Sequence, residues 1–398
     1  MNLFISGVVV ATAALLFLPW FVRSQQWRAT ITPLASIIGS GFLLLGPILQ
    51  HSYGLYAPLV MMGLCGVAYL FGAAIRFNIA QGGKAISQDS PLARQLEQAA
   101  SWALAFAYII SVAYYLNLFG AFSVSLTRHN DHLHAVLVTS AAYLVILVIG
   151  WAGGFRALER LQYVTVTAKL AVIAGLLAGL GVYFGHQASA GQLVFDAVQQ
   201  PLLPGLALAF GLIVTVQGFE TSRYLGAEYD APTRIRSMRN SQWISSLIYV
   251  VYISLFAYVF ERADFKLTET AIVAMMAVVA PVLPVFLVAG ALAAQFSAAV
   301  ADSSGSGGLM AELTRDRLSP RQAYALLVAL GLLLTWSVDV FEIVSYASRA
   351  FALYYALQAA IAARAALALP ASRLRGWAFA ALASLGLLMV LFGRAVAA

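Results

Sequence analysis

An apolar segment over residues 30–49 contains two glycines one residue apart, within the run Ile37-Ile38-Gly39-Ser40-Gly41-Phe42. Each glycine weakens a helix by about 1 kcal/mol, so a helix across this run is expected to break. Inside a membrane, backbone freed by a break is tolerated only where it faces protein or water. The freed amides can bind a carboxylate at the N-terminus of the following half-helix. Alternatively, the small residues serve only close helix packing.

A second apolar segment, over residues 203–226, is interrupted by the run Val214-Thr215-Val216-Gln217-Gly218-Phe219-Glu220. Its glycine follows a polar side chain and precedes an acidic one. The two interrupted segments are about 180 residues apart, which suggests two related halves of five spans each. A pair of broken segments in corresponding positions is the best sequence pointer to the binding site of a membrane transporter.

Four ionisable side chains lie deep in apolar segments: Lys169, Glu220, Asp302 and Arg349. Charges within a membrane are costly, so each is a functional candidate, and two acids with two bases suggest pairing. Lys169 could couple transport to protons by losing its proton when the site closes, or it could be a structural cation. Arg349 could clamp a second carboxylate, or form an internal ion pair with Asp302 or Glu220.

The composition identifies the kind of protein that carries these groups. Of 398 residues, 62% are hydrophobic and only 10% are charged, which excludes a soluble enzyme and a disordered chain. The net charge of +7 indicates basic loops at one membrane surface, and no nucleic-acid partner is expected. The single cysteine, Cys65, excludes a cysteine-based metal cluster, and no metal site or cofactor is predicted.

Hydropathy predicts an all-α polytopic membrane protein with about twelve spans. A short helix over 268–282 is expected to lie on the outer face. If the N-terminus is outside, most of the 23 Lys and Arg residues fall on the cytoplasmic side. The first span is expected to be retained, because no basic residue precedes it. The predicted spans are 3–22, 30–49, 57–80, 99–126, 133–153, 161–184, 203–226, 241–261, 285–310, 322–338, 340–363 and 375–396.

The chain is expected to form a single membrane domain, 1–398. Within it, an extra N-terminal helix over 1–29 precedes a first repeat over 30–185. A second repeat over 203–365 is followed by an extra C-terminal helix over 375–398.

The order of three motifs resembles the amino acid–polyamine–organocation (APC) superfamily. These are Gly39-Ser40-Gly41-Phe42, then Gly218-Phe219-Glu220, then Glu228 with Pro232. The stretch Thr314-Arg315-Asp316-Arg317-Leu318-Ser319-Pro320 is similar to a loop of that family. The resemblance covers about residues 30–365. It implies the LeuT-type fold, with five-plus-five inverted repeats and two broken helices, here with one extra span at each end.

The resemblance also implies roles for individual residues. Amides around Ser40 and Gly41 would bind a substrate carboxylate, and Glu220 would tie the broken seventh span to its neighbours. In some members a lysine at the position of Lys169 takes the place of a sodium ion. The chain departs from the family in having Val214 where an aromatic gate is common, and Arg317 where glycine is usual. The implied substrate-binding residues are Ile37, Ile38, Gly39, Ser40, Gly41, Val214, Thr215, Val216, Gln217 and Gly218.

These observations predict a secondary active transporter of a small amino acid or related zwitterion, working by alternating access in the inner membrane. Its expected partners are the substrate, protons coupled through Lys169, and the lipid bilayer. The alternatives are an exchanger, a carrier of another small organic ion, or a non-transporting membrane sensor or complex subunit. Glu220, Asp302 and Arg349 are expected to form a gating charge network. An enzyme is not expected.

Overall fold

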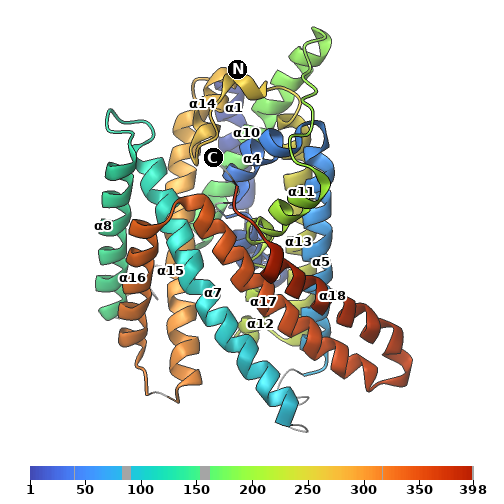
Figure 1. Cartoon of the computed structure of the whole chain (residues 1–398). Helices are drawn as coiled ribbons and strands as arrows, with labels where there is room; N and C mark the ends of the chain where they lie inside the picture. The colour runs from blue at the N-terminus through green and yellow to red at the C-terminus, as the bar shows by residue number, and fades with distance from the viewer. Residues whose placement is uncertain (40, 83–90, 153–161, 316, 397–398) are drawn as a thin grey trace.

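The computed structural model describes residues 1–39, 41–82, 91–152, 162–315 and 317–396. The regular structure of these residues is helical, and the helices form one bundle (Figure 1). Long helices α7 and α17 cross the bundle, α18 packs along α17, and α8 packs against α16. The α-helices are α1 (Asn2–Leu16), α2 (Pro19–Arg23), α3 (Gln25–Ile37), α4 (Gly41–Tyr53), α5 (Ala57–Ala80), α7 (Pro91–Val124), α8 (His132–Trp151), α10 (Gln162–Ser189), α11 (Leu202–Phe210), α12 (Thr221–Tyr224), α13 (Ala231–Phe256), α14 (Ala271–Val279), α15 (Leu283–Leu313), α16 (Pro320–Ser337), α17 (Val340–Leu367) and α18 (Arg373–Phe392). Short 3-10 helices are η1 (Gly54–Tyr56), η2 (Ile213–Val216), η3 (Leu225–Ala227), η4 (Arg262–Asp264) and η5 (Pro370–Ser372).

Seven helical segments of the described chain are long and apolar enough to cross a membrane, which identifies a polytopic membrane protein. The other predicted spans fall on helices that are shorter, interrupted or more polar, namely α1, α3, α11, α13 and α16. The layout of twelve spans therefore stays a prediction. The seven segments are Gly41–Ala80, Pro91–Val124, His132–Trp151, Tyr163–Ser189, Leu283–Leu313, Val340–Leu367 and Pro370–Phe392.

Polar side chains fix where several helices begin. Asp131 accepts a hydrogen bond from the His134 backbone N–H at the start of α8, which lowers the pKa of this carboxyl. Asp230 caps α13 in the same way, and hydrogen bonds from Thr233 lower the pKa of Asp230. At α16, Ser319 forms a reciprocal capping box with the third residue of the helix.

The N-terminal segment is an integral part of the packed bundle. The predicted span 3–22 is interrupted, because α1 ends at Leu16 and Pro19 begins the separate helix α2. Helix α1 packs on α10, where Gly179 leaves room for the fully buried Ile5. The predicted short helix at 268–282 is α14, which ends at Val279, before α15 begins.

Candidate functional site

The first predicted break is present between α3 and α4. Helix α3 ends at Ile37, and α4 begins at Gly41. Between them, the backbone of Ile38 is not helical, with φ −82° and ψ 62°. Ser40, predicted to bind a substrate carboxylate, lies outside the described residues. The last four carbonyls of a helix have no partner within it, so the end of α3 offers free backbone acceptors.

The second predicted break separates α11 from α12. Helix α11 ends at Phe210, the single 3-10 turn η2 follows, and the chain then extends to Glu220 before α12 begins. Gly218 has φ +115°, a left-handed conformation that favours glycine. The predicted residues Val214, Thr215, Val216 and Gln217 are all buried here.

The two breaks lie in direct backbone contact with each other. A Cβ atom added to Gly41 would lie 2.7 Å from the Cα of Thr215. A Cβ atom added to Gly218 would lie 2.6 Å from the backbone carbonyl carbon of Ser36. Both close approaches require glycine, so the motifs that break the two helices also let the broken segments meet.

Side chains from two other helices satisfy the backbone freed by the breaks. The hydroxyl of Tyr249, on α13, lies 2.9 Å from the carbonyl oxygen of Ile37 and 2.8 Å from that of Thr215. Ser348, on α17, donates to the Gly211 carbonyl at 2.7 Å and accepts from the Val214 N–H at 3.1 Å. Neither residue was predicted from the sequence.

Tyr249→Phe is expected to destabilise the protein by about 1–3 kcal/mol, because it leaves two buried carbonyls without their donor. The matched control is Tyr252→Phe, since Tyr252 is fully buried one turn along α13 and its hydroxyl has no hydrogen-bond partner in the part of the chain that the structure describes. Thermal unfolding of the purified protein followed by intrinsic fluorescence checks this. Equal unfolding temperatures for the two variants would contradict the bridging role.

Glu220 connects the second break to α17. One carboxylate oxygen, Oε2, accepts from the Gly218 N–H at 2.9 Å and from the Tyr355 hydroxyl at 2.9 Å. The other, Oε1, is buried and has no hydrogen-bond partner among the described residues. Gln217 donates to the Tyr115 hydroxyl of α7 at 3.1 Å. The polar residues around Gly218 therefore hold this break against α17 and α7.

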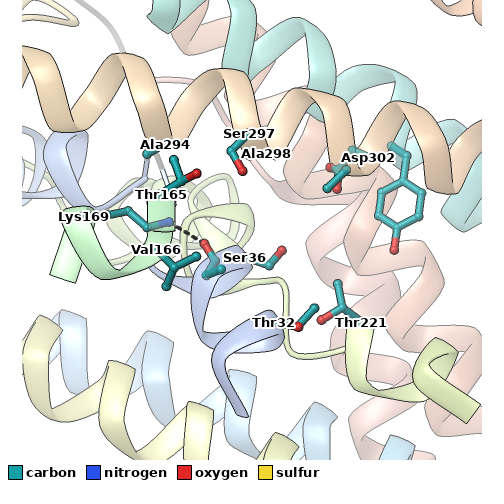
Figure 2. Close-up of a pocket in the computed structure, with 13 residues that line it drawn as sticks. Thr32, Ser36, Thr165, Val166, Lys169, Thr221, Ala294, Ser297, Ala298 and Asp302 are labelled. Atoms are coloured by element: carbon teal, nitrogen blue, oxygen red, sulfur yellow. Dashed lines mark hydrogen bonds between the residues drawn. The ribbon is translucent and has the colours of Figure 1, made fainter. Parts of the chain in front are cut away.

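Lys169 connects the first break to α10. Its ammonium donates to the carbonyl oxygen of Ala35 at 2.6 Å, and its side chain is 8% exposed (Figure 2). Ala35 is among the last four residues of α3, so Lys169 supplies a donor that the helix itself cannot. Cations near a helix C-terminus also interact favourably with the helix dipole.

A pocket extends from Lys169 along α15 to Asp302 (Figure 2). Asp302 is 5% exposed, and its Oδ2 accepts a hydrogen bond from the Ser111 hydroxyl of α7. None of the nine described residues that were predicted to bind substrate lines this pocket, which instead reaches the breaks at Ser36 and Thr221. The full lining is Thr32, Ala35, Ser36, Tyr108, Thr165, Val166, Lys169, Thr221, Ala294, Ser297, Ala298, Ala301 and Asp302.

The structure places Arg349 away from the pocket. Its guanidinium donates through Nε at 3.0 Å and through one terminal nitrogen at 2.6 Å to the carbonyl oxygen of Gly393. This carbonyl follows the last turn of α18, so Arg349 binds a helix C-terminus. Within the described chain, the ion pairs are Arg223 with Glu97 and His134 with Asp131, and neither involves Arg349.

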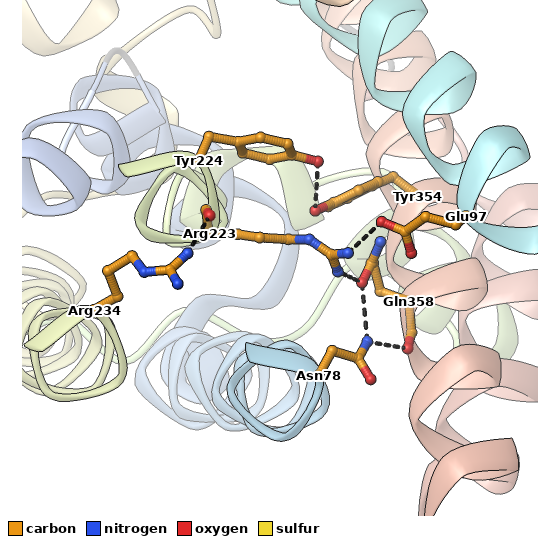
Figure 3. A network of polar contacts seen from close by, with 7 residues as sticks. All are labelled: Asn78, Glu97, Arg223, Tyr224, Arg234, Tyr354 and Gln358. Atoms are coloured by element: carbon orange, nitrogen blue, oxygen red, sulfur yellow. Dashed lines mark hydrogen bonds and ion pairs between the residues drawn. The ribbon is translucent and has the colours of Figure 1, made fainter. Parts of the chain in front are cut away.

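A second polar cluster joins five helices, and its residues are drawn in Figure 3. Arg223, on α12, pairs with Glu97 of α7 and donates to the side-chain oxygen of Gln358 on α17. Asn78, on α5, donates to both oxygens of Gln358 at 2.9 Å. Arg234, on α13, donates to the backbone carbonyl of Arg223 at 2.8 Å. In the sequence Arg223 and Arg234 indicated only a basic loop.

The long apolar helices define a polytopic membrane protein. Its two interrupted helices contact each other, and polar groups lie inside its helical bundle. The profile of an APC superfamily transporter family matches residues 19–393. The chain is also 38% identical to an uncharacterized protein of Aquifex aeolicus (strain VF5), over 99% of this chain and 98% of that protein. The chain therefore belongs to an APC superfamily transporter family, as its motifs indicated.

Proposed function

We propose that the protein is a secondary active transporter of a small amino acid or related zwitterion, coupled to protons through Lys169. Family membership and the membrane-type helices support transport. The backbone of the two breaks, with Gly39, Gly41 and Gly218, would bind the carboxylate and ammonium groups of the substrate. Alternating access would move the two halves of the bundle about this site.

The proposed layout is the LeuT-type arrangement of two five-span inverted repeats with an extra helix at each end, in the inner membrane with the N-terminus outside. In this layout α3 with α4, and α11 with α12, are the equivalent broken helices of the two repeats. Their direct contact at Gly41 and Gly218 supports the assignment. The short helix α14 then lies between the seventh and eighth helices of the repeats.

The proposal of proton coupling is based on the hydrogen bond from Lys169 to the carbonyl oxygen of Ala35. While the lysine is protonated, its ammonium holds the end of α3 against α10. Loss of the proton removes the charge and weakens this contact, which frees the half-helix to move. Protonation would thus select between two positions of α3, the requirement for coupling transport to a proton gradient.

Lys169→Ala is expected to lower acid-driven accumulation in liposomes at least tenfold, while exchange of substrate across the membrane at equal pH falls much less. The substrate would first be chosen by thermal stabilisation of the purified protein with each of the twenty amino acids. Lys266→Ala is the matched control, because Lys266 is exposed in a loop. Uptake by Lys169→Ala that keeps the wild-type dependence on the proton gradient would refute the coupling role.

A further inference from the structure

We propose that Asp302 is a binding site for the cationic side chain of the substrate, so that the protein transports amino acids with a positively charged side chain. This inference rests on the proposed transport of an amino acid and specifies its class. The carboxylate is buried, yet it lines the pocket that begins at the two breaks.

Asp302 lacks a positive partner within the described chain. The ion pairs there join Arg223 to Glu97 and His134 to Asp131. Lys169 is the other charged residue of the pocket lining, and its ammonium donates to the Ala35 carbonyl. An isolated buried carboxylate is costly, and a cation that enters the pocket would remove that cost.

The pocket is lined by hydroxyl-bearing and small apolar side chains, with the basic Lys169 at one end and the acidic Asp302 at the other (Figure 2). Along α15 the lining runs from Ala294, near Lys169, to Asp302, eight residues or about 12 Å of helix. Lys169 marks the end next to the first break, where the substrate's carboxylate would bind. A long side chain with a terminal ammonium or guanidinium would then reach toward Asp302.

The surroundings of Asp302 suit an organic cation. The Ser111 hydroxyl of α7 donates to one carboxylate oxygen and orients the group, while Tyr108, also on α7, lines the same pocket. An aromatic ring near a carboxylate favours binding of an ammonium or guanidinium group through its face. Asp302 therefore lies where it would favour substrates with a positively charged side chain over neutral ones.

The test compares two pairs of amino acids that match in shape and differ in charge. We expect the wild-type protein to bind L-arginine at least tenfold more tightly than L-citrulline, and L-lysine at least tenfold more tightly than L-norleucine. Asp302→Asn should abolish both preferences and leave the affinity for the neutral member of each pair within about twofold. Glu312→Gln, an exposed carboxylate on the same helix, should change neither. Calorimetric titration of the full-length protein measures all four affinities.

Each result separates this inference from the function on which it rests. Neutral amino acids that bind as tightly as their cationic partners would overturn the role of Asp302 and leave amino acid transport intact. Binding of no amino acid at all would refute the proposed function itself. Stabilisation by Na⁺ or K⁺ that Asp302→Asn removes, without selectivity among amino acids, would reassign the carboxylate to an inorganic cation. If Asp302→Asn does not fold, the wild-type selectivity alone decides.

Discussion

Gly218→Ala is expected to destabilise the protein by at least ~3 kcal/mol and to reduce transport to background. Alanine at φ +115° is strained by about 1–3 kcal/mol, and its Cβ would lie 2.6 Å from the backbone of Ser36. Backbone atoms cannot swing aside as the end of a side chain can, so the two breaks would have to separate. Thermal unfolding and liposome uptake measure the two effects.

Two further variants separate the strain of a positive φ from the clash of an added Cβ with the neighbouring backbone. Gly41→Ala creates a comparable clash with Thr215 without a positive φ, so it should destabilise the protein, but by less than Gly218→Ala. At Gly185 in α10, an added Cβ would meet no described atom within 4 Å, so Gly185→Ala should leave stability and uptake unchanged or slightly improved. Wild-type stability in Gly218→Ala would show that the breaks do not depend on this close contact.

The positions of both breaks could be predicted because their signals are local. Two glycines close together, or a glycine beside polar residues in an apolar run, weaken a helix wherever the chain places it. The structure accordingly ends α3 at Ile37, two residues before the first of the predicted glycines, whereas α11 already ends at Phe210, four residues before the predicted run begins at Val214. The end of α14 near Pro281 could be predicted for a similar reason, since proline cannot continue a helix from the preceding segment, whereas α14 begins at Ala271, three residues after the predicted start.

The groups that complete the site could not be predicted, because they come from distant helices. Tyr249 and Tyr252 lie one turn apart in the sequence and look alike, yet only Tyr249 binds the carbonyls of the breaks. Arg349 was expected to meet an acid, but its contacts are with the Gly393 carbonyl. A backbone carbonyl exists at every residue, so no sequence signal marks the one that an arginine will bind.

Glu97→Gln removes the ion pair between Arg223 and Glu97. We expect this variant to open the pocket at the end of the bundle where α7 begins. Arg223 lies three residues after Glu220, at the end of the second break, and its contacts hold this segment to α7 and α17 (Figure 3). Movement of α12 away from α7 must break these contacts. Hydrogen bonds to charged groups are worth about 1.5–3 kcal/mol, less where solvent reaches them. Glu97→Gln should therefore raise the population of the open state about tenfold.

The opening can be measured through a cysteine placed in the pocket. Ser297→Cys introduces a thiol on the pocket wall, while Cys65, the natural cysteine, is buried and provides the background. Adding Glu97→Gln should increase the rate of labelling by a polar thiol reagent about tenfold. Arg236→Ala, an exposed residue of α13, should not change it. Because Arg223→Gln already removes the contact with Glu97, adding Glu97→Gln to Arg223→Gln should increase the rate little further. Rates that multiply in the double variant would mean that the two residues hold α12 independently, and an unchanged rate in Glu97→Gln would mean that other contacts keep this end closed.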